Sequence, residues 1–229
     1  MEVGDIVARW EQVCTDIARA ALRSGRTARD VRLVAVSKYH PAESVAALYQ
    51  AGQRVFGENY VQEALTKRES LPADIEWHFI GHLQTNKVRQ VVGCFDLLHG
   101  VDSLKLAQSL QNKAAALGMR QKILVQVNLA REPQKSGIAP DQLPELAEYL
   151  LRASDLDWQG LMLMPPVFDD PEGARPYFTA LRELRDSLTQ QYGLLLPELS
   201  MGMTGDFMAA IEEGATMVRV GTRIFGERA

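Results

Sequence analysis

The run Val31-Arg32-Leu33-Val34-Ala35-Val36-Ser37-Lys38 governs how the rest of the sequence is interpreted. From 33 to 36 both alternating sets of positions are apolar, which is typical of a strand buried on both faces of a parallel sheet. Lys38 then stands at the carboxyl end of the strand, where α/β folds place their chemistry. Desolvation there disfavours the ammonium form, and a neutral amine forms a Schiff base with an aldehyde or ketone. The simpler alternative is a solvated lysine that closes the strand.

Short apolar segments alternate with segments of helical periodicity along the rest of the sequence. An amphipathic helix over 5–23 comes first, with Ile6, Trp10 and Val13 near one face. The strands are expected at 31–38, 54–58, 76–80, 97–101, 122–128, 158–164, 198–203 and 217–220. The intervening helices are expected over 42–50, 142–152, 173–192 and 206–213, with three others ending near Glu69, Gly93 and Gly118.

This alternation is the signature of a (β/α)8 barrel, and a doubly wound sheet is the alternative. The predicted fold class is therefore α/β: one TIM-barrel domain over residues 1–229, with an extra amino-terminal helix. The sequence ends at Ala229, soon after the eighth strand, without room for a full eighth helix. We expect the amino-terminal helix to cover that gap.

Composition and charge restrict the partners of the protein. Of its 229 residues 46% are hydrophobic and 24% charged, and the formal net charge is −4. Such a chain lacks the basic face that nucleic acid or an anionic membrane requires. Cys14 and Cys94 have no metal-ligand spacing and the four histidines share no face, so no metal is predicted. The amino terminus is unlike a signal peptide and no apolar run has transmembrane length, so a cytoplasmic protein is expected.

Two glycine-containing loops follow the seventh and eighth predicted strands. The first is Ser200-Met201-Gly202-Met203-Thr204-Gly205-Asp206 and the second is Gly221-Thr222. Barrel enzymes often hold phosphate here, because glycines let backbone N–H groups approach an anion and hydroxyls donate hydrogen bonds. Ordinary glycine turns, with Thr204 or Asp206 as a helix cap, are the alternative. The position of both loops on adjacent strands favours phosphate binding.

Arg219 lies inside the last predicted strand, where a charge must be paired or bound. A structural salt bridge is one explanation, and an arginine that faces a ring nitrogen is the other. Because a closed barrel puts its first strand beside its eighth, Lys38, Arg219 and the two loops converge. These are the contacts that pyridoxal 5′-phosphate requires: a Schiff-base lysine, a partner for the pyridine nitrogen, and a phosphate site.

Five motifs occur in order along nearly the whole chain. They are VAVSK at 34–38, FGENY at 56–60, HFIGHLQTNK at 78–87, LSMGMTGD at 199–206 and VRVGTRIFG at 218–226. Together they resemble the pyridoxal phosphate homeostasis protein family, whose fold is similar to the amino-terminal barrel of alanine racemase. The resemblance therefore implies a barrel of that type.

The resemblance also implies cofactor contacts for eight positions. Lys38 carries pyridoxal phosphate as a Schiff base, and Arg219 faces the pyridine nitrogen. The remaining implied contacts are, for the phosphate, Ser200, Thr204, Gly221 and Thr222 and, for the ring, Asn59 and Met201.

The chain departs from the family pattern at two places. Thr204 stands where serine is more usual, and the hydroxyl is retained. Tyr39-His40-Pro41 replaces a threonine-lysine-proline run, which changes the rim of the expected site.

The function implied by the resemblance is intracellular homeostasis of pyridoxal phosphate. Such a protein buffers the cofactor or delivers it to apoenzymes, affects amino-acid and keto-acid pools, has no strong catalytic activity and is a monomer. A minimal amino-acid racemase is the alternative, with Tyr60 and His82 as candidates for a second acid or base. Alanine racemase needs a further β-rich domain that supplies a catalytic tyrosine, and we expect none here. A class I aldolase-like barrel, whose lysine captures a substrate carbonyl, is a third possibility.

Overall fold

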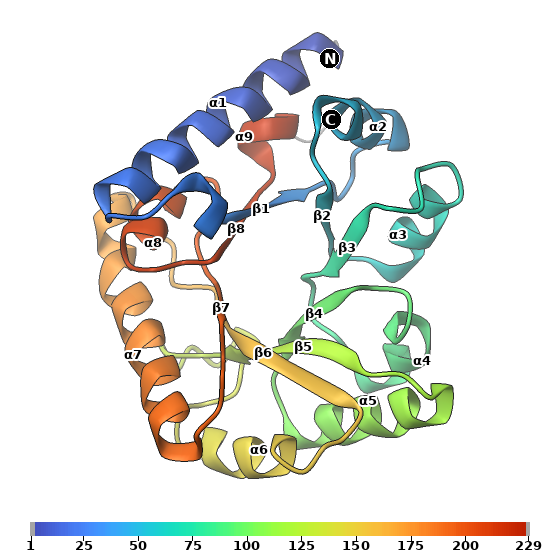
Figure 1. The fold of residues 1–229 in the computed structure, drawn as a ribbon, viewed down its shortest axis with the longest axis vertical. Helices are drawn as coiled ribbons and strands as arrows, with labels where there is room; N and C mark the ends of the chain where they lie inside the picture. Colours follow the sequence, from blue (N-terminus) through green and yellow to red (C-terminus); the bar gives the residue numbers. More distant parts are fainter. Residues whose placement is uncertain (1–2, 228–229) are drawn as a thin grey trace.

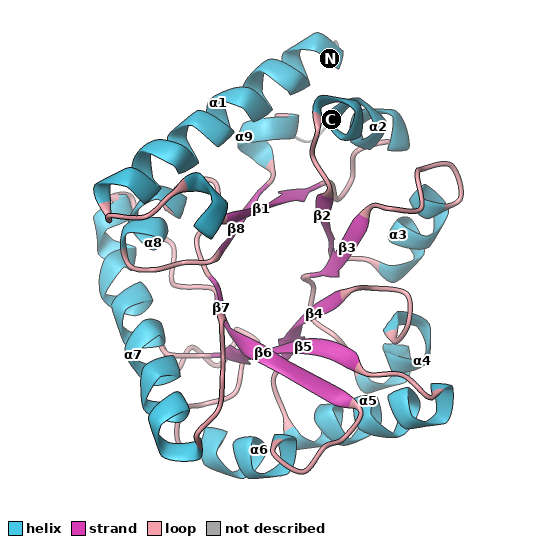
Figure 2. Ribbon diagram, viewed as in Figure 1, coloured by secondary structure: helices cyan, strands magenta, loops and turns pink. Residues whose placement is uncertain are grey.

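Eight parallel strands close into a barrel that is surrounded by helices (Figures 1 and 2). The structure, a computed structural model, describes residues 3–227. Each strand pairs with the next in sequence, and β8 pairs with β1, which confirms the predicted (β/α)8 barrel. The strands are β1 Arg32–Val36, β2 Val55–Glu58, β3 Glu76–Phe79, β4 Leu97–Val101, β5 Gln121–Val127, β6 Leu156–Leu163, β7 Glu198–Ser200 and β8 Met217–Val220.

The helices follow the expected order along the chain. The α-helices are α1 Val3–Arg23, α2 Ala42–Ala51, α3 Val61–Arg68, α4 Val88–Val91, α5 Leu104–Leu117, α6 Leu143–Leu150, α7 Arg175–Tyr192, α8 Phe207–Glu212 and α9 Thr222–Phe225, and the 3-10 helices are η1 Ala28–Asp30, η2 Thr85–Lys87 and η3 Pro171–Ala174. In the described part of the chain no helix combines the length and apolarity needed to cross a membrane.

Strand β7 is shorter than predicted and ends at Ser200 rather than 203. The cause is Gly202, whose φ of +90° turns the chain out of the sheet. A Cβ there would lie 2.6 Å from the Cβ of Ala210, so the turn also brings the loop against α8. The residues expected to extend the strand instead form the loop at its carboxyl end.

Helix α1 covers the side of the barrel where β8 meets β1 (Figure 1). It packs against α2, α8 and the short α9 and buries its own side chains Ile6, Val13 and Ile17. The helix that follows β8 has only four residues. The expectation that the amino-terminal helix covers this gap is therefore confirmed.

The inside of the barrel combines apolar and polar side chains. Six strands contribute one residue each to a separate buried cluster: Val34, Val55, Leu97, Leu124, Met162 and Met217. At the corresponding level β3 contributes His78, paired in register with Leu97, and β7 contributes Ser200, paired with Met162 and Met217. Because His78 and Ser200 are both fully buried, their polar atoms must find partners inside the barrel.

Candidate functional site

Lys38 lies in the turn directly after β1, half-buried, at the carboxyl end of the barrel. Its neighbour Tyr39 has a φ of +66°, a left-handed conformation that is uncommon for a residue other than glycine. The Tyr39 N–H donates a 2.6 Å hydrogen bond to Oε1 of Glu63 on α3. The turn that presents Lys38 is therefore held by a side chain of the next strand–helix unit.

Three charged side chains support the same turn from below. Lys67 Nζ donates to Oε1 of Glu58 at 2.6 Å, to Oε1 of Glu63 at 2.7 Å and to the carbonyl oxygen of Ser37 at 2.7 Å. The Ser37 hydroxyl donates to the same Glu58 oxygen at 2.6 Å. We call Ser37, Glu58, Glu63 and Lys67 the Lys67 network.

The Lys67 network is largely removed from water. The side chain of Glu58 is 0% exposed and that of Lys67 is 6% exposed. Burial raises the pKa of the Glu58 carboxyl, and the charge and hydrogen bond of Lys67 oppose that rise. A buried pair of this kind depends on both partners, since either charge alone would lack compensation.

Arg219 is a buried cation on the strand next to Lys38. It is 4% exposed, and the β1–β8 register places it opposite Val34. One guanidinium nitrogen donates to Ser200 Oγ, and Nη2 donates to the carbonyl oxygen of Leu163 at 2.8 Å. Burial lowers the pKa of Arg219 to about 10, against the attraction of Asp206, so the group is still charged at neutral pH.

No carboxylate among residues 3–227 forms an ion pair with Arg219. The structural salt bridge considered from the sequence is therefore absent from the described residues. A buried guanidinium that bonds only to neutral oxygens still has donors and a positive charge to offer a ligand.

The two predicted phosphate loops lie at the same end of the barrel. The backbone N–H of Arg219 donates to the Gly202 carbonyl oxygen at 3.0 Å, which ties the β7 loop to β8. Within that loop the Met203 N–H donates to Oδ1 of Asp206 at 2.6 Å. A Cβ on Gly221 would lie 3.2 Å from the carbonyl oxygen of Val36, so the second loop touches the end of β1.

The remaining predicted contacts differ in their exposure. Met201 is fully buried in the hydrophobic core, Thr204 is half-buried in the β7 loop, and Thr222 is exposed at the start of α9. Asn59 follows β2 and is half-buried, and its Oδ1 is a buried atom without a hydrogen-bond partner within the described part. Asn59 thus offers a polar atom that the protein itself leaves unsatisfied.

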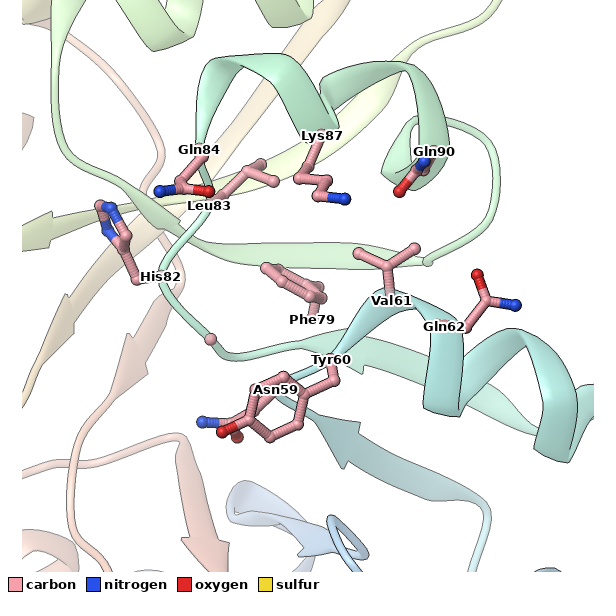
Figure 3. A pocket seen from close by; sticks show the side chains of 11 residues that line it. Asn59, Tyr60, Val61, Gln62, Phe79, His82, Leu83, Gln84, Lys87 and Gln90 are labelled. Atoms are coloured by element: carbon pink, nitrogen blue, oxygen red, sulfur yellow. The ribbon is translucent and has the colours of Figure 1, made fainter.

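A cavity of about 530 Å³ adjoins Asn59 (Figure 3). Asn59 and Tyr60 lie on one side of it, and Gln84, Lys87 and Gln90 come from the segment opposite. The Tyr60 hydroxyl is 2.5 Å from that of Tyr39, so the two tyrosines join the rim of this cavity to the Lys38 turn.

The histidine prediction was wrong in one respect. His78 and His99, treated as unrelated positions, lie on adjacent strands with His78 Nδ1 and His99 Nε2 3.0 Å apart. His78 Nε2 lies 2.9 Å from Glu76 Oε1, and His99 Nδ1 lies 2.9 Å from Ser200 Oγ. We call Glu76, His78, His99, Ser200 and Arg219 the His78–His99 network.

Apart from Ser200 and Arg219, the sequence pattern marked no member of the two networks as a site residue. Glu58 belongs to one of the recognised motifs, but nothing marked Lys67 or Glu63 as more than helix-surface residues. His78 and His99 lie in two consecutive predicted strands. The sequence could have indicated their contact if the two strands were assumed to pair and both side chains to point into the barrel. Among residues 3–227 no group of His, Cys, Asp and Glu has the geometry of a metal site, and the prediction of no metal stays a prediction.

Comparison with known sequences gives consistent relatives. The model of the alanine racemase N-terminal domain matches residues 16–229. The pyridoxal phosphate homeostasis protein of Aquifex aeolicus is 47% identical over 221 residues, covering 96% of this chain and 97% of the relative. The protein of that name from Escherichia coli is 40% identical over 234 residues, covering 99% and 98%.

Solved structures show the same barrel. PipY of Synechococcus elongatus, determined with pyridoxal phosphate bound, is 41% identical, with a TM-score of 0.79 over 92% of this chain and 100% of PipY. Alanine racemase of Corynebacterium glutamicum is 16% identical, with a TM-score of 0.77 over 98% of this chain and 62% of the racemase. The second likeness concerns the fold alone.

Proposed function

This chain belongs to the pyridoxal phosphate homeostasis protein family, and from that membership we propose that it binds pyridoxal 5′-phosphate and takes part in the homeostasis of this cofactor. The observation that carries the proposal is the junction of β1 and β8. There Lys38 lies in the turn after β1, the buried cation of Arg219 lies on β8, and Gly221 touches the end of β1.

The residues at this junction fit the cofactor. Arg219 supplies a buried positive charge without a carboxylate partner among the described residues, and Asn59 supplies an unsatisfied buried oxygen. Gly202 and Gly221 let the two loops pack against α8 and the end of β1, where a side chain would collide or crowd. We assign Lys38 to the aldehyde and Arg219 to the pyridine nitrogen. The other proposed contacts are Asn59, Ser200, Met201, Thr204, Gly221 and Thr222.

Bound pyridoxal phosphate supplies an electrophilic aldehyde carbon and an electron-withdrawing ring. Arg219 keeps its proton because a guanidinium does not transfer it at neutral pH. An unprotonated ring nitrogen withdraws electrons weakly, which favours a carrier of the cofactor over an aminotransferase or decarboxylase. Delivery to pyridoxal-phosphate-dependent apoenzymes, in a monomeric state, belongs to this same proposal.

The test is the visible absorbance of the purified protein after addition of pyridoxal phosphate, beside that of Lys38→Ala. We expect the wild type to gain an absorbance band above about 400 nm, which is typical of a protonated imine of this cofactor, and the variant to lack this band. A wild-type protein that neither gains this band nor retains the cofactor on gel filtration would refute the assignment.

A second candidate, a minimal amino-acid racemase, rests on the contact between the hydroxyl of Tyr39, the residue after Lys38, and that of Tyr60. Such a pair offers an acid or base on a second side of a ligand held by Lys38. Incubation of the loaded protein with L-alanine, followed by chiral analysis, distinguishes the two functions. The carrier function predicts no steady formation of D-alanine.

A further inference from the structure

The His78–His99 network crosses the inside of the barrel, from Glu76 and His78 on β3, through His99 on β4, to Ser200 on β7 and Arg219 on β8. Its outer end, Glu76, is partly exposed at the amino end of β3. Its inner end is the guanidinium assigned above to the pyridine nitrogen. The network therefore joins an ionic group at one end of the barrel to the candidate site at the other.

For two neutral imidazoles, the groups at the two ends fix the direction of every hydrogen bond between them. A guanidinium only donates and an ionised carboxylate only accepts. His78 Nε2 must therefore carry the proton that faces Glu76, which leaves Nδ1 of a neutral His78 to accept from His99 Nε2. His99 Nδ1 then accepts from the Ser200 hydroxyl, whose oxygen accepts from Arg219. The two ends require the same direction, so the arrangement is self-consistent.

The surroundings favour a neutral imidazole at His99. Burial holds the pKa of His99 well below its usual value, and a positive charge on His78 or Arg219 acts in the same direction. The hydrogen bond of His78 holds the pKa of Glu76 below its usual value, with help from Arg32 and Lys122. Arg32 Nη1 lies 3.3 Å from Glu76 Oε1, and Arg32 Nη2 lies 3.8 Å from Glu198 Oε1. At the other end of the network the charge of Asp206, in the β7 loop, favours the protonated form of Arg219.

We propose that Glu76, His78 and His99 are positioning residues for Arg219. By accepting the only hydroxyl hydrogen of Ser200, His99 leaves the serine oxygen as an acceptor that orients the guanidinium. In this arrangement the Ser200 hydroxyl has no hydrogen to donate to a phosphate. This revises the phosphate contact that the family resemblance implied for Ser200 and leaves the phosphate to Thr204, Gly221 and Thr222. The inference deepens the proposed function and rests on it for the role of Arg219.

The first test reads the proton positions directly. The full-length protein, labelled with ¹⁵N-histidine, is examined by long-range ¹H–¹⁵N correlation NMR at neutral pH without added cofactor. His78→Gln and His99→Gln each remove one ring and so assign the signals. We expect both rings to be neutral with the proton on Nε2. A proton on Nδ1 of His99, or a cationic His78, would overturn the proposed direction.

The second test measures affinity for pyridoxal phosphate by fluorescence titration. We expect His99→Leu to weaken binding by about tenfold, the loss expected for one hydrogen bond to a charged group. His99→Gln keeps an amide that accepts from Ser200 and donates to His78, so it should recover most of the affinity. Urea titration of the same variants without cofactor separates a loss of affinity from a loss of fold.

Gln126→Leu is the matched control. Gln126 is 2% exposed on β5 and donates 2.9 Å to the Ser136 carbonyl oxygen, without a bond to the His78–His99 network. Gln126→Leu should lower the free energy of unfolding and leave the affinity for pyridoxal phosphate unchanged. Equal affinity losses in Gln126→Leu and His99→Leu, or none in His99→Leu, would refute the positioning role. A wild type that binds no pyridoxal phosphate would refute the proposed function instead, and the NMR result would still stand.

Discussion

The Lys67 network and the His78–His99 network support the two basic residues of the candidate site, Lys38 and Arg219, in different ways. The first contains three charged side chains and reaches the Lys38 turn through the Ser37 carbonyl and the Tyr39 N–H. The second has charges only at its ends and contacts the guanidinium of Arg219 through Ser200. One network fixes a main-chain turn and the other fixes a head group.

This difference suits the two proposed roles. A lysine that forms a covalent bond must move its amine during the reaction, so support through its main chain leaves the side chain to rearrange. An arginine that stays a cation at a ring nitrogen benefits from a fixed head group, because preorganised donors need no reorganisation when the ligand arrives. The comparison also predicts that loss of one charge from the Lys67 network lowers the free energy of unfolding more than loss of one imidazole from the His78–His99 network.

Loss of a charge from the Lys67 network should have the largest effect. We expect Lys67→Met to lower the free energy of unfolding by about 3 kcal/mol, because it leaves Glu58 buried without its cation. Urea denaturation measures the change. The double variant Lys67→Met/Glu58→Gln should recover much of the loss, since no buried charge remains. A double variant that is less stable than Lys67→Met would contradict the assignment.

Loss of the central imidazole should have a smaller effect. We expect His99→Leu to cost about 1–3 kcal/mol in urea denaturation, because Ser200 and His78 each lose a buried hydrogen-bond partner. Stability equal to that of the wild type would show that the two bonds contribute nothing. A loss greater than that of Lys67→Met would reverse the predicted order of the two networks.

Glu63 tests whether charge or hydrogen bonding holds the Lys38 turn. Glu63→Gln keeps an oxygen that accepts from the Tyr39 N–H and from Lys67, and removes only the charge. Because the Glu63 side chain is 23% exposed, we expect a loss of about 1 kcal/mol or less in urea denaturation. Its matched variant, Glu63→Ala, removes the acceptor as well and should cost more. Equal losses would mean that the acceptor is unimportant.

Glu76→Gln should have the smallest effect and a dependence on pH. The pKa of Glu76 in the folded protein lies below the ordinary value of 4.5, so its carboxylate stabilises the fold above that pH and the contribution disappears as the pH falls through the folded value. The carboxylate is partly exposed, so the variant should lose less than about 1 kcal/mol at pH 7. Thermal denaturation from pH 7 down to about pH 3 should show the two proteins converge. A difference that grows in acid would contradict this.

Much of the fold and part of the site follow from local sequence patterns. The alternation of apolar strands and amphipathic helices predicted the barrel, and closure of that barrel predicted that the first strand, with Lys38 at its end, lies beside the eighth, which contains Arg219. The early end of β7 was not predicted, because it depends on the backbone angle of Gly202 and its packing against Ala210.

The two networks depend on information that local patterns lack. Lys67 reaches Ser37 across thirty positions because α3 packs against the end of β1 and β2. His78 meets His99 only because β3 and β4 pair with the register His78 opposite Leu97, which places both rings on the inner side. Register and helix placement are tertiary properties, so the partners of these buried polar groups could not be read from their spacing in the sequence.

The pairing of β8 with β1 has a consequence for the order of folding. Lys38 and Arg219 belong to opposite ends of the sequence, and the strands that position them pair only at the seam that closes the ring. A growing or partly unfolded chain in which β1–β7 have docked therefore has Lys38 after the strand at one free edge and Arg219 on a strand that is not yet paired. A ligand that contacts the residues of both β1 and β8 binds the closed barrel and stabilises it by mass action. Release of such a ligand and separation of β8 from β1 are therefore thermodynamically linked.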